Sequence, residues 1–89
     1  MCDVRPMELK DTVEMMTSND YKEQFIAEYC QIKIRYGKLK CMLEKWDEGI
    51  LEFTPTCPRC TLGLQISAME NYLAILEARA VMESIALPK

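Results

Sequence analysis

The sequence has no histidine, only three glycines and no long apolar run. Histidine is the commonest general base and the commonest metal ligand, so its absence removes both roles. No Gly-rich phosphate loop and no nucleophile elbow is present either. We therefore expect a protein that is not an enzyme and that holds no cofactor and no metal. Because no apolar run approaches the roughly 20 residues of a membrane span, we also expect no membrane association.

A secretion signal and a strong charge of either sign are also missing. Residues 1–16 are charged and lack the apolar core of a signal peptide, which predicts a cytoplasmic protein. The formal net charge of -3 argues against direct nucleic acid binding, which needs a basic surface. An odd number of cysteines without a secretion signal predicts reduced thiols. These cysteines are Cys2, Cys30, Cys41, Cys57 and Cys60.

What the chain does have is 89 residues with a hydrophobic content of 49%, including seven methionines. This length allows one domain, 1–89, and size scaling lets it bury only roughly 60 to 65% of its unfolded surface. The methionines are typical of an adaptable apolar surface. Small helical proteins with so thin a core often self-associate, so we expect a homo-oligomer.

The first half of the chain predicts two helices. Residues 7–16 fit one short helix, with Pro6 at its first turn. A long helix is predicted over residues 18–48, with Thr17 as its N-cap and Asp20 at the capping-box position. Its apolar residues follow alternating spacings of four and three, which is the heptad pattern of a helix that packs on a partner. They are Phe25, Tyr29, Ile32, Tyr36, Leu39, Leu43, Trp46 and Ile50.

The second half predicts a connector over residues 49–60 and another long helix over 61–86. Gly49 suits a helix C-terminus, and Pro55 and Pro58 cannot continue a helix. The second helix has its own heptad stripe, formed by Leu62, Ile66, Met69, Leu73, Leu76 and Ala80. The predicted fold class is therefore all-α, a long antiparallel helical hairpin with a short N-terminal helix. The heptad stripes serve equally for helices that pair within one chain and for helices that swap between chains.

A second apolar flank makes the later helix wider than one partner helix can cover. It consists of Ala68, Tyr72, Ile75 and Met82. The N-terminal helix is one possible cover. A second copy of the chain, joining the first in a helical bundle, is the cover that we favour.

Cys57-Pro58-Arg59-Cys60 is the most conspicuous local motif. A redox motif of this kind normally ends a strand in a thioredoxin-like sheet, and no such strand pattern is present. A zinc ion needs four ligands, which only the motifs of two chains together would supply. We favour the interpretation that these residues shape the connector and begin the second helix.

Polar residues suited to an anion lie on both long helices. The basic segment of the first helix contains Lys33, Arg35, Lys38 and Lys40, with Tyr36 among them. On the second helix, Gln65, Tyr72 and Arg79 recur at intervals of seven beside the apolar stripe, so they follow one edge of the helix pair. Lysine and arginine bind phosphate, tyrosine stacks on a base, and glutamine binds a base or sugar edge. The predicted ligand-binding residues are Lys33, Arg35, Tyr36, Gln65, Tyr72 and Arg79.

The alternative for this edge is structural. Arg79 pairs in that case with Glu83 one turn further along, or with a glutamate of the first helix. A buried Arg79 without an acidic partner would indicate a missing anion.

The third feature is an acidic cluster at the hairpin tip, formed by Asp47, Glu48 and Glu52. Such clusters are usually only solvated surface. The alternative is a surface that imitates nucleic acid and occupies a basic groove on a target protein.

Three sequence blocks resemble a family of small proteins from crAss-like phages and from prophages of gut Firmicutes. They are Asp20 to Glu23 with Glu28 to Leu39, Phe53 to Pro58, and Gln65, Met69, Tyr72 with Leu76 to Ala80. The resemblance covers about three quarters of the chain and leaves the first sixteen residues outside. It implies a phage or prophage protein in the cytoplasm of an infected or lysogenic bacterium. Small helical phage proteins of this type often counter bacterial antiviral defence.

The function expected first is thus a binding protein that sequesters a cyclic nucleotide immune signal. A second hypothesis is an inhibitor of anti-CRISPR type that binds a host defence nuclease through the acidic tip. A third is a phage regulatory or scaffold protein that acts by helix–helix interaction.

Overall fold

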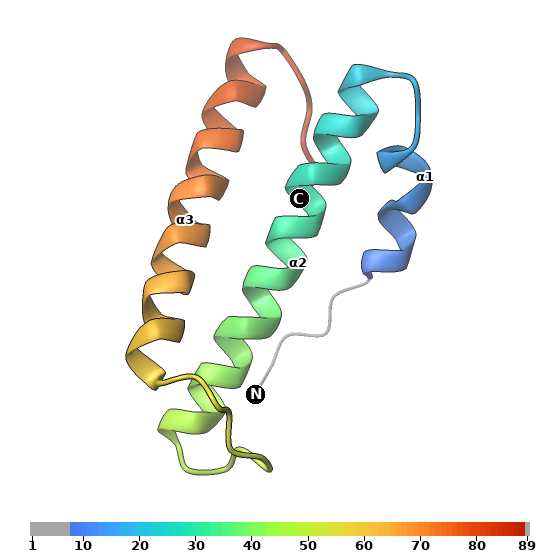
Figure 1. Ribbon diagram of the computed structural model, residues 1–89. Helices are drawn as coiled ribbons and strands as arrows, with labels where there is room; N and C mark the ends of the chain where they lie inside the picture. Colours follow the sequence, from blue (N-terminus) through green and yellow to red (C-terminus); the bar gives the residue numbers. More distant parts are fainter. Residues whose placement is uncertain (1–7, 89) are drawn as a thin grey trace.

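The computed structural model describes residues 8–88. Four helical segments follow one another: a 3-10 turn η1 (Leu9–Thr12), α1 (Val13–Met16), α2 (Tyr21–Asp47) and α3 (Arg59–Met82). Within these residues there is no strand, which confirms the all-α class. None of the helices in this part of the chain is long and apolar enough to cross a membrane. Figure 1 shows α2 and α3 side by side, with the short N-terminal helix beside α2.

The predicted helix over residues 7–16 is in fact η1 followed directly by α1. Glu8 and Asp11 form a reciprocal capping box at its start. The hydroxyl of Thr12 is fully buried and donates to the carbonyl of Leu9 at 2.7 Å. Both segments pack on α2, and neither contacts α3. Along the described chain, the N-terminal helix therefore gives no cover to the apolar flank of α3.

The long helix α2 begins at Tyr21, three residues later than predicted, and ends at Asp47. Its N-cap is Asp20, whose carboxylate accepts a hydrogen bond from the amide of Lys22 at 3.0 Å. The prediction that Thr17 is the cap is wrong, because Thr17 follows the end of α1 and its hydroxyl donates to the carbonyl of Val13, the first residue of α1. Gly49 has φ +76° and closes the helix, a conformation that costs glycine little.

Helix α3 begins at Arg59, two residues earlier than predicted, and ends at Met82 rather than at residue 86. The chain leaves the helix through Ser84, which has φ +56°. The amide of Ile85 then donates to the carbonyl of Ala80 at 2.8 Å, and the Ile85 side chain is buried. Figure 1 shows this last segment turning back along α2. The apolar C-terminus thus ends α3 early because it packs into the core.

The core lies between the two heptad stripes. Phe25, Tyr29 and Cys30 of α2 form one cluster with Leu76 and Ala80 of α3 and with Ile85. Leu43, further along the same stripe toward the connector, is buried as well. Burying such side chains stabilises the fold by roughly 1.5–3 kcal/mol each. This packing fixes which residues of α2 and α3 stand opposite one another.

Candidate anion-binding site

One edge of the contact between α2 and α3 is a ladder of hydrogen-bonded pairs, which we call the closed edge. It consists of Tyr29, Tyr36 and Asp47 on α2 and of Glu77, Glu70 and Arg59 on α3. The two tyrosine hydroxyls donate to the glutamates at 3.0 and 3.2 Å. Arg59 donates two hydrogen bonds to Asp47, both at 3.0 Å. As the residue number rises along α2 it falls equally along α3, which is the register of an antiparallel pair.

The other edge, which we call the open edge, carries Tyr21, Glu28 and Arg35 on α2 and Arg79, Tyr72 and Gln65 on α3. Residues on each helix are seven apart, so the three pairs lie at successive levels. The first pair is joined, since Arg79 donates to the hydroxyl of Tyr21 at 2.9 Å. The second is joined by the hydroxyl of Tyr72, which donates to Glu28.

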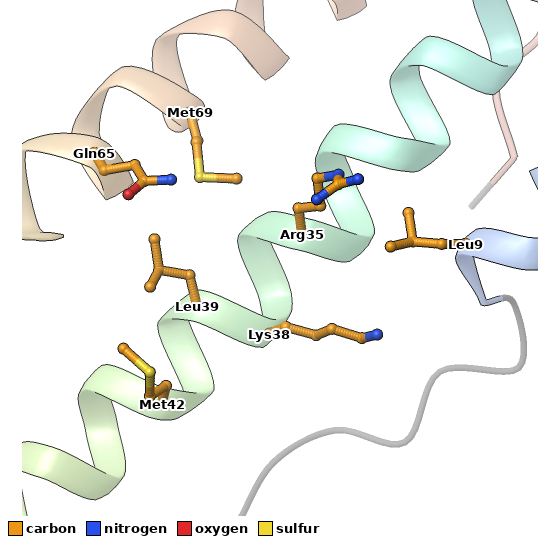
Figure 2. Close-up of a pocket in the computed structure, with 7 residues that line it drawn as sticks. All are labelled: Leu9, Arg35, Lys38, Leu39, Met42, Gln65 and Met69. Atoms are coloured by element: carbon orange, nitrogen blue, oxygen red, sulfur yellow. The ribbon is translucent and has the colours of Figure 1, made fainter. Parts of the chain in front are cut away.

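The third level of the open edge differs from the other two. Arg35 and Gln65 form no hydrogen bond with each other, and neither has a hydrogen-bond or ion-pair partner anywhere among residues 8–88. Both line a hollow of about 350 Å³, together with Leu9, Lys38, Leu39, Met42 and Met69. Figure 2 shows Gln65 and Met69 directed from α3 toward α2, with Arg35 on the side nearer Leu9. The hollow therefore occupies the position of a missing pair.

The chemistry of this hollow suits an anion with an apolar part. Arg35 presents a planar guanidinium that binds phosphate or carboxylate through two hydrogen bonds. Lys38 adds a second cation, which has no ion-pair partner within the described residues. The floor is apolar, and its two methionines pack well against flat aromatic groups. Two exposed, unpaired cations beside such a floor are typical of a site for a phosphorylated ligand.

Two of the six predicted ligand residues, Arg35 and Gln65, meet in the hollow, and the other four lie outside it. Lys33 donates to the hydroxyl of Tyr29 at 3.1 Å and lies 5.3 Å from the centre of its ring. Tyr36 belongs to the closed edge, where its hydroxyl donates a hydrogen bond to Glu70. Tyr72 is bound to Glu28 at the second level. The structure thus does not gather the six residues into one site.

Arg79 follows the structural alternative. It lies 3.5 Å from Glu83, one turn further along, and its guanidinium stacks over Phe25 at 4.8 Å from the ring centre. The hydrogen bond with Tyr21 raises the pKa of Arg79 above its ordinary value, so it stays charged. Its side chain is 41% exposed and has an acidic partner. The buried, unpaired arginine that would have indicated an anion is therefore not found at this position.

Sequence reasoning missed five of the seven residues that line the hollow. Lys38 belongs to the predicted basic segment, and only its spacing from Arg35 signals a shared face. Met42 continues the series of Glu28 and Arg35 at intervals of seven, so the heptad pattern does place it on this edge. Leu9 comes from η1, and nothing in the sequence indicates that this segment lies beside Arg35.

The cysteines differ in environment. Cys57 and Cys60 carry free, exposed thiols, and Cys30 carries a free, buried one. Burial raises the pKa of the Cys30 thiol, which keeps it protonated and unreactive. Cys41 is disulfide-bonded, so the prediction of reduced thiols is wrong for this residue.

A family model for the Sequestin proteins matches residues 19–82. The chain belongs to the Sequestin family. No curated protein and no solved structure matches it. The Sequestin match covers α2, the connector and α3 to its last residue, and leaves η1 and α1 outside. Both edges of the helix pair thus lie within the matched residues, whereas Leu9 lies outside them.

Proposed function

We propose that this Sequestin is a non-enzymatic protein that sequesters a cyclic nucleotide signal of bacterial antiviral defence. The observation that carries the proposal is the hollow at the third level of the open edge, where Arg35, Lys38 and Gln65 have no polar partner among residues 8–88. The family name is consistent with binding that withdraws a ligand rather than transforms it.

The phosphate part of the ligand binds Arg35 and Lys38. Gln65 stands on the opposite helix and offers an amide that both donates and accepts, which suits a base or a sugar edge. In place of the tyrosines expected from the sequence, Met42 and Met69 lie where a base would pack. Their thioethers make favourable contacts with aromatic rings.

The size of the hollow limits what one chain can hold. Its volume of about 350 Å³ lies near the lower end of the roughly 300–1,000 Å³ of ligand sites. It accommodates one nucleotide unit, whereas a cyclic dinucleotide has two phosphates and two bases. A homo-oligomer in which two chains each supply a hollow would match such a ligand. We therefore propose that the working form is an oligomer.

The proposed biological setting is consistent with the same chemistry. A cytoplasmic protein that binds a nucleotide tightly and does not hydrolyse it lowers the free concentration of that nucleotide. In a phage or prophage of the kind that the sequence blocks resemble, this removes the signal that activates host defence. No catalytic step is needed for this role.

Calorimetry with a panel of cyclic di- and trinucleotides tests the proposal. We expect at least one to bind, and Arg35→Ala to weaken its binding about 10- to 100-fold, because a hydrogen bond to a charged group contributes about 1.5–3 kcal/mol. Lys40→Ala is the matched control, since it removes a cation of the same helix that does not line the hollow. Absence of binding to every member of the panel would overturn the proposal, as would equal losses in the two variants.

One observation favours a second candidate, a protein-directed inhibitor. Beside the acidic cluster at the tip, Ile50 and Phe53 are 60% and 58% exposed, which suits a contact with another protein. Asp47 is already neutralised by Arg59, so Glu48 and Glu52 are the charges that remain for a target. This candidate predicts co-purification with a host nuclease complex and loss of inhibition when Asp47, Glu48 and Glu52 are neutralised together.

A further inference from the structure

The face of α3 that points away from α2 carries a second heptad stripe, which we call the outer stripe. Its members are Leu64, Ala68, Asn71, Ile75, Ala78 and Met82, and all six are exposed. The exposed fractions of Leu64, Ile75 and Met82 are 73%, 58% and 80%. The spacing keeps these residues in line over about 27 Å of helix, at a rise of 1.5 Å per residue. None of the six carries a charge, so the stripe resembles a buried helix face rather than a solvated one.

The outer stripe is close to symmetric about its centre. A large, flexible side chain stands at each end, Leu64 and Met82, and an alanine follows at each end, Ala68 and Ala78. A two-fold interface brings residue i of one copy against residue j of the other and j against i. Two outer stripes that run in opposite directions therefore place Leu64 against the partner's Met82 and Ala68 against the partner's Ala78. We infer that the outer stripe binds a second copy of this chain in antiparallel orientation.

The centre of this interface is also complementary. Asn71 meets the partner's Ile75, so each amide lies beside an aliphatic side chain and keeps its polar end at the rim. No charged residue of one copy faces a like charge of the other along the stripe, because the stripe has none. The alanines on either side of the centre let the two helices approach closely.

The same register joins the open edges of the two chains. Tyr72 lies two residues from the level of the partner's Tyr72, and Gln65 lies two residues from the level of the partner's Arg79. The two open edges then face the same side of the dimer, so the partner's Arg79, held by Tyr21 and Glu83 of its own chain, adds positive charge on the side where Arg35 and Lys38 lie. This consequence rests on the proposed function, because it bears on the anion site; the self-association does not depend on it.

The surface area that the two outer stripes bury places this contact among weak, transient interfaces. One helix face on each side buries on the order of 1,000 Å² in total, which is close to the minimum for a specific interface. We therefore expect a reversible dimer that forms at high chain concentration and dissociates on dilution.

Light scattering on the full chain in the absence of nucleotide is the first test. The expected mass at high concentration is twice the chain mass of 10.3 kDa. Ile75→Arg, at the centre of the outer stripe, should give the monomer mass at the same concentration. Ile50→Arg makes the same change at an exposed residue of the hairpin tip and should leave the dimer intact. A monomeric wild type, or equal masses for both variants, would overturn the inference.

Cysteine cross-linking tests the orientation. In a Cys57→Ser, Cys60→Ser background, protein with Ala68→Cys mixed with protein with Ala78→Cys should form a disulfide-linked dimer on oxidation. Ala68→Cys alone should not, because its copies are then far apart; cross-linking of this variant with itself would mean a parallel pair and would overturn the antiparallel register. A dimer that binds no nucleotide refutes the proposed function alone, whereas a monomer that binds one refutes this inference alone.

Discussion

The two edges of the α2–α3 contact are built on the same heptad register, yet they differ at one level. On the closed edge all three pairs are satisfied, by Tyr29 with Glu77, Tyr36 with Glu70 and Asp47 with Arg59. On the open edge the first two pairs are satisfied, whereas Arg35 and Gln65 of the third have no polar partner in the described part of the chain. A polar pair that is satisfied within the chain contributes to stability. A cation that has no partner among the described residues and lies beside an apolar hollow can instead bind a ligand. This difference distinguishes the structural edge from the candidate site.

The largest effect should come from breaking the closed edge at its buried level. Tyr29 is only 3% exposed, and its hydroxyl bonds both Glu77 and Lys33. Tyr29→Phe should lower the free energy of unfolding by about 0.5–1.5 kcal/mol, the usual net value of a buried hydrogen bond. Arg35→Ala on the open edge should change it by less than about 0.5 kcal/mol. Urea unfolding measures both, and a larger loss for Arg35→Ala would contradict the contrast between the edges.

A smaller effect should follow when the open level is closed artificially. Gln65→Glu places a carboxylate opposite Arg35, and an exposed ion pair of this kind contributes about 0.2–1 kcal/mol. We expect a slightly more stable protein whose affinity for a cyclic nucleotide falls more than tenfold. The new carboxylate forms an ion pair with the guanidinium of Arg35 and repels phosphate.

Gln65→Ala is the control for this variant. It removes the amide but leaves Arg35 unpaired, so it should keep most of the phosphate contribution. If calorimetry gave the same nucleotide affinity for Gln65→Glu and for the wild type, Arg35 would have no role in the hollow.

The sequence was sufficient for the helices and for half of the polar pattern, because both depend on spacing. The heptad stripes predicted the buried Phe25, Tyr29, Leu76 and Ala80, and the interval of seven placed Gln65 on one edge. The ends of the helices were less accurate. Thr17 and Asp20 both satisfy the local rules for an N-cap, and only the hydrogen bond to Val13 shows how Thr17 is used.

The hydrogen-bond and ion-pair partners of the site residues could not be predicted from the sequence. Whether an arginine is paired depends on side-chain distances between two helices, and the same pattern that leaves Arg35 unpaired joins Arg79 to Tyr21 and Glu83. Leu9 reaches the hollow from η1, which no periodicity relates to α2. The early end of α3 likewise depends on Ile85, whose burial is a property of the whole core.

The smallest effect concerns the exposed end of the closed edge and depends on pH. The hydrogen bonds from Arg59 hold the pKa of Asp47 below its ordinary value, so the folded state favours the charged carboxylate. A group with a lowered pKa stabilises the fold above the pKa of the unfolded chain, about 3.9 for aspartate, and loses this contribution as pH falls through the folded value. Asp47→Asn should therefore be slightly less stable than the wild type at pH 7, and this deficit should shrink as the pH falls below the unfolded pKa and disappear below the folded one. Glu48→Gln, which removes a neighbouring exposed carboxylate without an ion-pair partner among residues 8–88, is the control for the loss of one negative charge. Thermal unfolding of the three proteins across this range measures the effect. A deficit of Asp47→Asn that persists in acid would mean that the closed edge is held at this end by geometry rather than by charge.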